Sequence, residues 1–208
     1  MNFDINYFMR QLIILAPALL FALTVHELAH GLVAYRLGDP TAKNAGRLTM
    51  NPLKHLDPWG VLAFIIMKIG WAKPVPVNPR YFKHPQKDML LVALAGPGAN
   101  ILLAIASASL AHFFDSLNVL PVFIQLPLIN MLVASVQINI MLAVFNCIPI
   151  PPLDGSKVLM GLLPPTMARS YAKLEPFGFL VILGLFYTGF IGWVIMPAIS
   201  FFTHLLLG

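Results

Sequence analysis

The sequence predicts an all-α integral membrane protein with about four transmembrane helices and a re-entrant extended loop between the first two. Three observations support this class of fold. Hydrophobic residues make up 59% of the 208 residues and charged residues 10%, and a soluble domain of this size cannot hide so much apolar surface. Four apolar runs are long enough to cross a bilayer. The basic residues gather in the loops of one side.

The expected spans are the long apolar runs of the chain. A helix rises about 1.5 Å per residue, so about 20 apolar residues cross a hydrocarbon layer of roughly 30 Å. The runs that meet this length are 8–37, 89–114, 123–148 and 177–207. The shorter run 61–69 is expected to lie within the re-entrant loop, 38–87. Because internal repeats and linkers are not visible, residues 1–208 are expected to form a single membrane-embedded domain.

The basic residues predict the orientation in the membrane. Of the 13 Lys and Arg, 12 lie at the end of the first span, between the first and second spans, or between the third and fourth, and only Arg10 lies on the other side. The positive-inside tendency then places the loops 38–87 and 149–176 in the cytoplasm and both termini outside, in a multi-pass protein of the cell membrane. The basic residues behind the net charge of +5 are distributed by topology and are not clustered on one face or helix. Membrane lipid, and not nucleic acid, is therefore the expected partner.

Two short segments of the loop are expected to be extended, 46–50 and 71–77. Pro74, Pro76 and Pro79 prevent helix in the second of them. Proline also restricts a strand to a sheet edge, where an extended peptide can add as a further strand. The alternative is an interfacial loop anchored by Trp71, and the residues alone leave both interpretations open.

The first span contains His26-Glu-Leu-Ala-His30, an HExxH arrangement. Four residues of helix turn about 400°, so both imidazoles point the same way and can bind one Zn²⁺. Glu27 can reach a water beside the metal without being a ligand. Each ionisable group near the bilayer centre costs at least about 2.5 kcal/mol, so these three side chains require a compensating partner. One zinc ion per chain is the expected partner.

A catalytic zinc usually takes three protein ligands, and Asp154 is the candidate for the third. It follows the helix-breaking prolines at the end of the third span, close to polar Asn146. Irregular backbone at membrane depth is tolerated only beside protein or a water-filled cavity, which marks this break as a site. Most other acids lie at span ends. The alternative role of Asp154 is an N-cap for the helix that begins near Gly155.

The two motifs together resemble the paired signature of the site-2 protease family, which are intramembrane zinc metalloproteases. These motifs are His26-Glu-Leu-Ala-His30 and Asn146-Cys-Ile-Pro-Ile-Pro-Pro-Leu-Asp154-Gly, and the segments 51–60, 70–78 and 95–100 resemble compact members without a PDZ domain. The resemblance implies that His26, His30 and Asp154 bind zinc. It also implies that Glu27 is the catalytic base, that Asn146 is a polarising donor beside the metal, and that the extended loop guides substrate.

The expected function is that of a zinc-dependent endopeptidase that cleaves transmembrane segments of membrane proteins or peptides within the bilayer. Asn100 and His55 are further candidates for substrate contact, Asn100 because of its family counterpart. One alternative is a membrane metal transporter, but such proteins usually show internal repeats and have no use for Glu27 beside a ligand. The other alternative is a non-catalytic membrane-binding homologue, which does not need every catalytic residue type.

Overall fold

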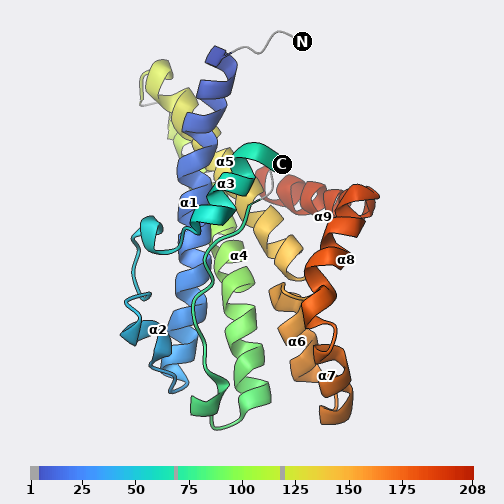
Figure 1. The fold of residues 1–208 in the computed structure, drawn as a ribbon. Coiled ribbons are helices and arrows are strands. Elements are labelled where there is room, and N and C mark those ends of the chain that lie inside the picture. Colours follow the sequence, from blue (N-terminus) through green and yellow to red (C-terminus); the bar gives the residue numbers. More distant parts are fainter. Residues whose placement is uncertain (1–4, 68–69, 118–119) are drawn as a thin grey trace.

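The computed structural model describes residues 5–67, 70–117 and 120–208, and the regular structure in these ranges is helical (Figure 1). This confirms the all-α class for the described part of the chain. The elements in order are α1 (Ile5–Arg36), α2 (Thr41–Asn44), η1 (Pro52–Lys54), α3 (Pro58–Met67), η2 (Pro79–Tyr81), α4 (Pro85–Leu117), α5 (Val122–Asn146), α6 (Asp154–Leu162), α7 (Pro165–Ala172), α8 (Glu175–Tyr187) and α9 (Phe190–Leu207).

Three of these helices are long and apolar enough to cross a membrane: α1, α4 and α5. They run down, up and down in Figure 1 and match the predicted spans 8–37, 89–114 and 123–148 to within a few residues. The end of α1 and the start of α4 therefore lie at the same end of the bundle, while α5 ends near mid-height in this view. With three such helices the chain is a multi-pass membrane protein.

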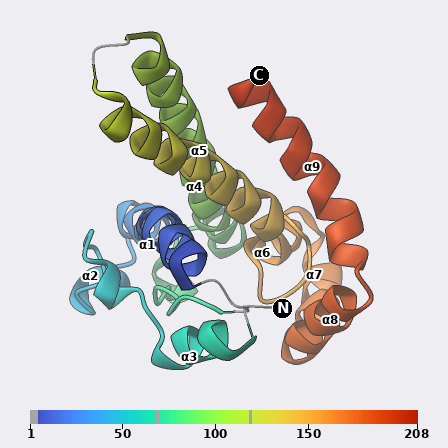
Figure 2. The ribbon, with the colours of Figure 1, turned by 90° about the horizontal axis from the view of Figure 1, so that it is seen from above.

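Seen from above, α4 and α5 lie in the middle, with α1 on one side and α9 running alongside α5 on the other (Figure 2). Small residues let the helices approach closely, which is how helices pack in a solvent as apolar as their side chains. The hydroxyl oxygens of Ser107 on α4 and Ser135 on α5 lie 2.8 Å apart and join the two helices. The buried cluster between them consists of Ala104, Ala108, Val136 and Ile140, against which Ile199, Leu206 and Leu207 of α9 pack.

The prediction of one continuous span over 177–207 is wrong. The structure has two shorter apolar helices there, α8 of 13 residues and α9 of 18 residues. Gly189 between them has φ of 74°, a left-handed conformation that ends a helix and that glycine adopts without steric cost. The chain therefore turns at this residue, and α9 packs against α5 instead of continuing α8 (Figures 1 and 2).

The segment 38–87 begins and ends at the lower end of the bundle (Figure 1), and that it is re-entrant in a membrane stays a prediction. It leaves the lower end of α1, rises to α3 beside the middle of α1, and returns to the lower end of α4 (Figure 1). The described part of the apolar run 61–69 belongs to α3, while residues 68–69 lie outside the described ranges. Asp39 is fully buried and ties the two ends of the loop together. Its carboxylate accepts hydrogen bonds from the backbone N–H of Thr41 (2.9 Å) and of Asn78 (2.7 Å).

Residues 71–77 form no helix, as their prolines predict, and they do not join a sheet. The prediction that 46–50 is extended is wrong, because this segment is mostly turn and bend. Within the described residues the pairing is a single isolated antiparallel bridge between Leu56 and Ala72. The segment runs down the front of the bundle in Figure 1, between α3 and η2. Its backbone therefore takes its hydrogen-bond partners from side chains and loops of this chain.

The arrangement of α4 predicts the result of a labelling experiment. Lys83 precedes α4 and Ser116 is near its other end, about 50 Å away along a helix of this length. In a Cys147→Ser background, Lys83→Cys and Ser116→Cys are expected to react with an impermeant maleimide from opposite sides of the membrane. Reaction of both from one side would contradict α4 as a transmembrane helix.

Candidate metal centre

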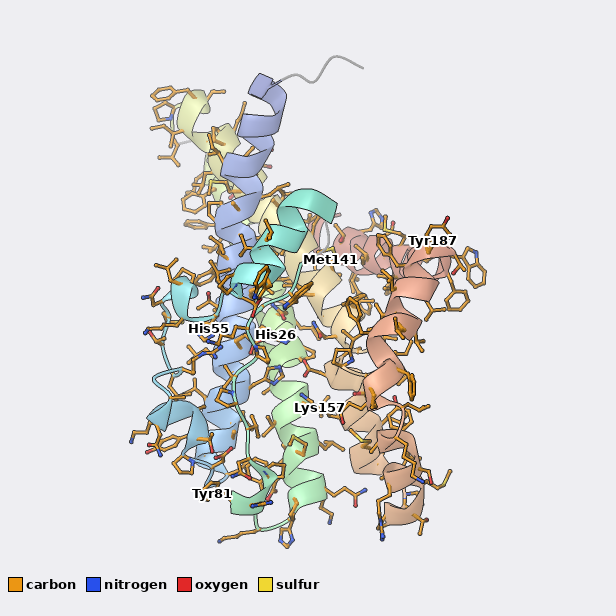
Figure 3. All side chains as sticks on the ribbon, viewed as in Figure 1. His26, His55, Tyr81, Met141, Lys157 and Tyr187 are labelled. Carbon is orange, nitrogen blue, oxygen red and sulfur yellow. The ribbon has the colours of Figure 1, made fainter. Side chains whose placement is uncertain are left out.

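His26 and His30 lie on one face of α1, one turn apart, as their spacing predicts (Figure 3 labels His26). Both side chains are buried. The ring centroids are 4.6 Å apart with an interplanar angle of 83°, and the two Nε2 atoms are 3.0 Å apart. The helix thus brings two imidazole nitrogens to one point in the interior.

Asp154 reaches the same point from the far end of the chain. Helix α5 ends at Asn146 because the prolines that follow cannot continue it. Asp154 is the first residue of α6, where Leu153 holds the N-cap position without a side-chain capping bond. Its Oδ2 lies 3.1 Å from Nε2 of each histidine, while Oδ1 lies 4.0 Å from Lys157 Nζ. Of its two predicted roles, the structure supports the ligand and not the N-cap.

The partners of the two rings determine which nitrogen carries the proton. His30 Nδ1 lies 2.7 Å from the backbone oxygen of Val92, and because a carbonyl only accepts, Nδ1–H is the donor. His26 Nδ1 lies 2.6 Å from Asn100 Oδ1, whose amide nitrogen donates to other oxygens. Both Nε2 atoms therefore carry bare lone pairs that face each other and Asp154.

Three electron-rich atoms at 3.0–3.1 Å from one another need a shared cation. Neutral imidazoles and a carboxylate are ligands that zinc prefers. Tetrahedral ligands with bonds of about 2.0–2.1 Å lie about 3.3 Å from one another, close to the spacing found here. The donor set of His26, His30 and Asp154 thus fits Zn²⁺ and leaves a fourth position for water or substrate.

Gly96 on α4 leaves space directly at the ligand atoms. A Cβ at this position would lie 2.4 Å from His30 Nε2 and 2.6 Å from His26 Nε2, closer than real Cβ atoms come. Any side chain would therefore fill the space that a metal must occupy. The sequence analysis assigned Gly96 no site role, although its position one helical turn before Asn100 was a usable signal.

Glu27 is held by the re-entrant loop. Its Oε2 accepts a hydrogen bond of 2.8 Å from the backbone N–H of Val75. The segment that contains Val75 is fixed by both backbone groups of Lys73. The N–H of Lys73 donates to His55 O (2.8 Å), and its carbonyl accepts from Arg47 Nη2 (2.6 Å). The side chains in the sequence carry no signal for these contacts, because the groups that meet Glu27 and hold the segment are largely backbone atoms.

The remaining predicted site residues are Asn146, Asn100 and His55, and of these Asn100 contacts a predicted ligand, His26. Asn146 is the last residue of α5, and its amide nitrogen donates to Leu142 O (3.0 Å). Asn100 is fully buried behind His26, and His55 is buried in the loop with Nε2 2.9 Å from Thr49 O. The oxyanion role of Asn146 and the substrate contacts of Asn100 and His55 stay predictions.

A buried set of three ligands that fits zinc, inside a bundle of apolar helices and with Glu27 next to a ligand in the sequence, is the arrangement of a membrane metalloenzyme. The comparisons with known proteins agree with this class. The chain matches the family model described as "Peptidase family M50" over residues 14–185. It is 40% identical over 188 residues to "Putative zinc metalloprotease YwhC" of Bacillus subtilis (strain 168), a match that covers 89% of this chain and 85% of that protein.

Two further relatives are more distant. The chain is 32% identical over 176 residues to "Putative zinc metalloprotease Rip2" of Mycolicibacterium smegmatis, covering 81% of this chain and 64% of that protein. It is 25% identical over 158 residues to "Zinc metalloprotease MJ0392" of Methanocaldococcus jannaschii, covering 76% and 35%. No solved structure matches the chain significantly. The chain belongs to peptidase family M50, the site-2 protease family that its motifs predicted, and is a zinc metalloprotease that hydrolyses peptide bonds.

The ligand set predicts the zinc content of variants. His26→Ala, His30→Ala and Asp154→Ala are each expected to lower zinc in the purified protein well below about one ion per chain, because two remaining ligands form an incomplete site. Plasma mass spectrometry measures the content. Cys147→Ser is the control, since the single cysteine is exposed at the end of α5 and should keep the metal. Full zinc retention by Asp154→Ala would remove that residue from the ligand set.

The close approach of α4 predicts that a methyl group at position 96 also disturbs the metal. Gly96→Ala is expected to lower zinc affinity although no ligand is changed, because its Cβ meets imidazoles that are already held at Nδ1. Gly98→Ala is the matched control on the same helix, since a Cβ there meets no atom within 4 Å. Equal zinc affinities for the two variants, measured by chelator competition, would contradict the crowding at Gly96.

Proposed function

We propose that this zinc metalloprotease is an endopeptidase that cleaves transmembrane segments of other membrane proteins within the bilayer. The observation that carries the proposal is the depth of the ligand set in the apolar helices. His26 lies ten residues before Arg36, the last residue of α1, which is about 15 Å along the helix. A peptide bond that reaches the ligand set is then inside the hydrocarbon layer and well away from its surface.

The chemistry follows from the neighbours of the scissile bond. When bound, one zinc ion per chain supplies a Lewis acid that polarises the scissile carbonyl and lowers the pKa of a water molecule. Glu27 takes a proton from the attacking water and delivers it to the leaving amine, so the products are a new carboxyl end and a new amino end. Because Val75 N–H holds Oε2, the other oxygen of Glu27 is the one left for this transfer.

Asn146 is proposed as the donor to the oxyanion that develops on the scissile carbonyl. Its amide nitrogen bonds within α5, to Leu142 O, at the point where the helix ends. The role therefore requires this amide to turn from its own helix toward the substrate. A donor of this kind contributes about 3 to 4 kcal/mol in other hydrolases.

The substrate must present an extended backbone, since a helix hides its amides. The loop beside Glu27 has limited means to pair with it. Lys73 N–H already donates to His55 O, Val75 N–H donates to Glu27, and the intervening Pro74 has no N–H. The run 73–76 thus keeps no free donor, because Pro76 has none either. We propose that this segment positions Glu27 and lines the substrate path without forming a regular ladder over these residues.

The proposal includes the orientation in the cell membrane. The loops 38–87 and 149–176 carry 11 of the 13 Lys and Arg. The first loop joins the lower ends of α1 and α4, and α6 and α7 of the second extend toward the same end (Figure 1). We place this end in the cytoplasm and both termini outside. Substrates are then transmembrane proteins or peptides that approach through lipid, and the lipid itself is the second partner.

The proposal predicts that zinc binding and proteolysis separate at Glu27. Glu27→Gln is expected to bind zinc like the wild type and to cleave a transmembrane substrate at least about a hundredfold more slowly, the low end for loss of general acid and base catalysis. The substrate is found as the membrane protein that accumulates uncleaved with the Glu27→Gln variant. It is then reconstituted with purified enzyme, and cleavage is followed by mass spectrometry of the products.

Two results would contradict the proposal. Cleavage sites mapped outside the apolar segment of the substrate would contradict the membrane location of the cut. Wild-type cleavage rates in zinc-loaded Glu27→Gln would remove Glu27 from the reaction, and zinc flux in proteoliposomes would then test the transporter alternative.

Helix-loosening Gly or Asn near the scissile bond is expected to speed cleavage by the wild type, because fewer helix contacts must be broken.

A further inference from the structure

A chain of buried amides connects the ligand His26 to the opposite helix α5. Asn100 on α4 and Asn139 on α5 are both fully buried. The links are His26 Nδ1 to Asn100 Oδ1 (2.6 Å), Asn100 Nδ2 to Asn139 Oδ1 (2.8 Å), and Asn139 Nδ2 to the backbone oxygen of Ser135 (2.8 Å). The proposed mechanism uses neither asparagine.

The direction of every hydrogen bond in this chain is determined by backbone carbonyls. Ser135 O only accepts, so the amide nitrogen of Asn139 faces it and Oδ1 faces Asn100. Asn100 must then turn its amide nitrogen to Asn139, and the same nitrogen also donates to Ala22 O (3.3 Å). Its oxygen is left to face His26, which therefore donates from Nδ1–H and keeps Nε2 bare.

The second histidine is oriented by a different kind of partner. His30 Nδ1–H donates directly to the backbone oxygen of Val92, which no substitution removes. The orientation of His26 depends on two side chains. Of the two imidazoles, His26 is thus the one whose readiness to bind metal depends on residues outside the ligand set.

We infer that Asn139 is a positioning residue for the zinc site, acting through Asn100 to hold His26 in the tautomer that presents Nε2 to the metal. This inference rests on the proposed zinc site. Without Asn139, the amide of Asn100 keeps only the longer contact to Ala22 O and can rotate by half a turn. Its NH₂ would then face His26 Nδ1, which selects the tautomer with the proton on Nε2, and that proton blocks the metal.

The test compares two substitutions of similar size at the same buried position. Asn139→Leu removes the acceptor for Asn100. Asn139→Asp keeps it, because a carboxyl group buried in apolar surroundings is neutral and its OH can donate to Ser135 O in place of the amide. Asn100→Leu is the direct reference. Thr24→Val is the control, since it removes a buried hydroxyl of α1 that bonds only to Leu20 O of its own helix.

The measurements are zinc affinity of the purified full chain, by competition with a chromophoric chelator, and the visible spectrum of the Co²⁺-substituted protein. Asn100→Leu is expected to weaken zinc binding about 10- to 100-fold, and Asn139→Leu, one link further away, about 3- to 10-fold. Both should alter the Co²⁺ spectrum. Asn139→Asp and Thr24→Val should bind zinc like the wild type.

The thermal unfolding midpoint of the metal-free protein separates positioning from packing. A purely structural role of Asn139, joining α4 and α5, would lower this midpoint in Asn139→Leu and leave zinc affinity and the Co²⁺ spectrum unchanged. That result would overturn the inference, as would equal zinc affinities for Asn139→Leu and Asn139→Asp. Should Asn139→Leu not fold, Asn139→Ser gives the same comparison with a side chain too short to reach Asn100.

The design also distinguishes failure of this inference from failure of the proposed zinc site. If wild-type protein binds no zinc, or if His26→Ala binds it equally well, the zinc site itself is wrong. If the wild type binds zinc, His26→Ala does not, and Asn139→Leu matches the wild type, only the inference about Asn139 is wrong.

Discussion

The structure depends on one electrostatic constraint, the repulsion among three electron-rich atoms that are buried together in the protein. The Nε2 atoms of His26 and His30 and the Oδ2 of Asp154 lie 3.0–3.1 Å apart in the interior of an apolar bundle. A carboxylate and two lone pairs in such a place repel one another and cost several kcal/mol without a cation. Zinc offsets this repulsion, and the neighbours of the ligands keep protons from taking its place.

The two parts of the catalytic apparatus are held by different parts of the chain. The ligands come from α1 and from the helix start that follows the break after α5, and α4 supports them through Val92 and Asn100. Glu27 is held from the other side, by the re-entrant loop that Asp39 and Arg47 fix in place. Glu27, the proposed general base, can therefore be positioned independently of the metal, although it is the residue next to a ligand.

The prolines of the loop have a consequence for how a substrate can bind. Pro74 and Pro76 alternate with residues whose N–H groups are already used inside the protein. A segment of this kind keeps an extended shape without inviting another strand, as edge strands with proline do in soluble proteins. Because its N–H groups are used or missing, the segment cannot form a ladder over 73–76. The same arrangement lets the backbone N–H of Val75 hold Glu27.

The amino-acid sequence by itself determined the all-α membrane class, the first three long helices, the absence of helix over 71–77 and the pairing of His26 with His30. These follow from local properties, namely the length of apolar runs, proline placement and the periodicity of one helix. The break at Gly189 was missed because both sides of it are equally apolar, and composition does not register a change of backbone direction.

Tertiary structure decided the rest. Contacts between residues 39 to 128 positions apart decide three features of the site. They decide whether Asp154 caps a helix or meets the histidines, which nitrogen of His26 carries the proton, and what holds Glu27. Such contacts are made by helix packing and by backbone atoms, and neither is encoded in the type of any single residue.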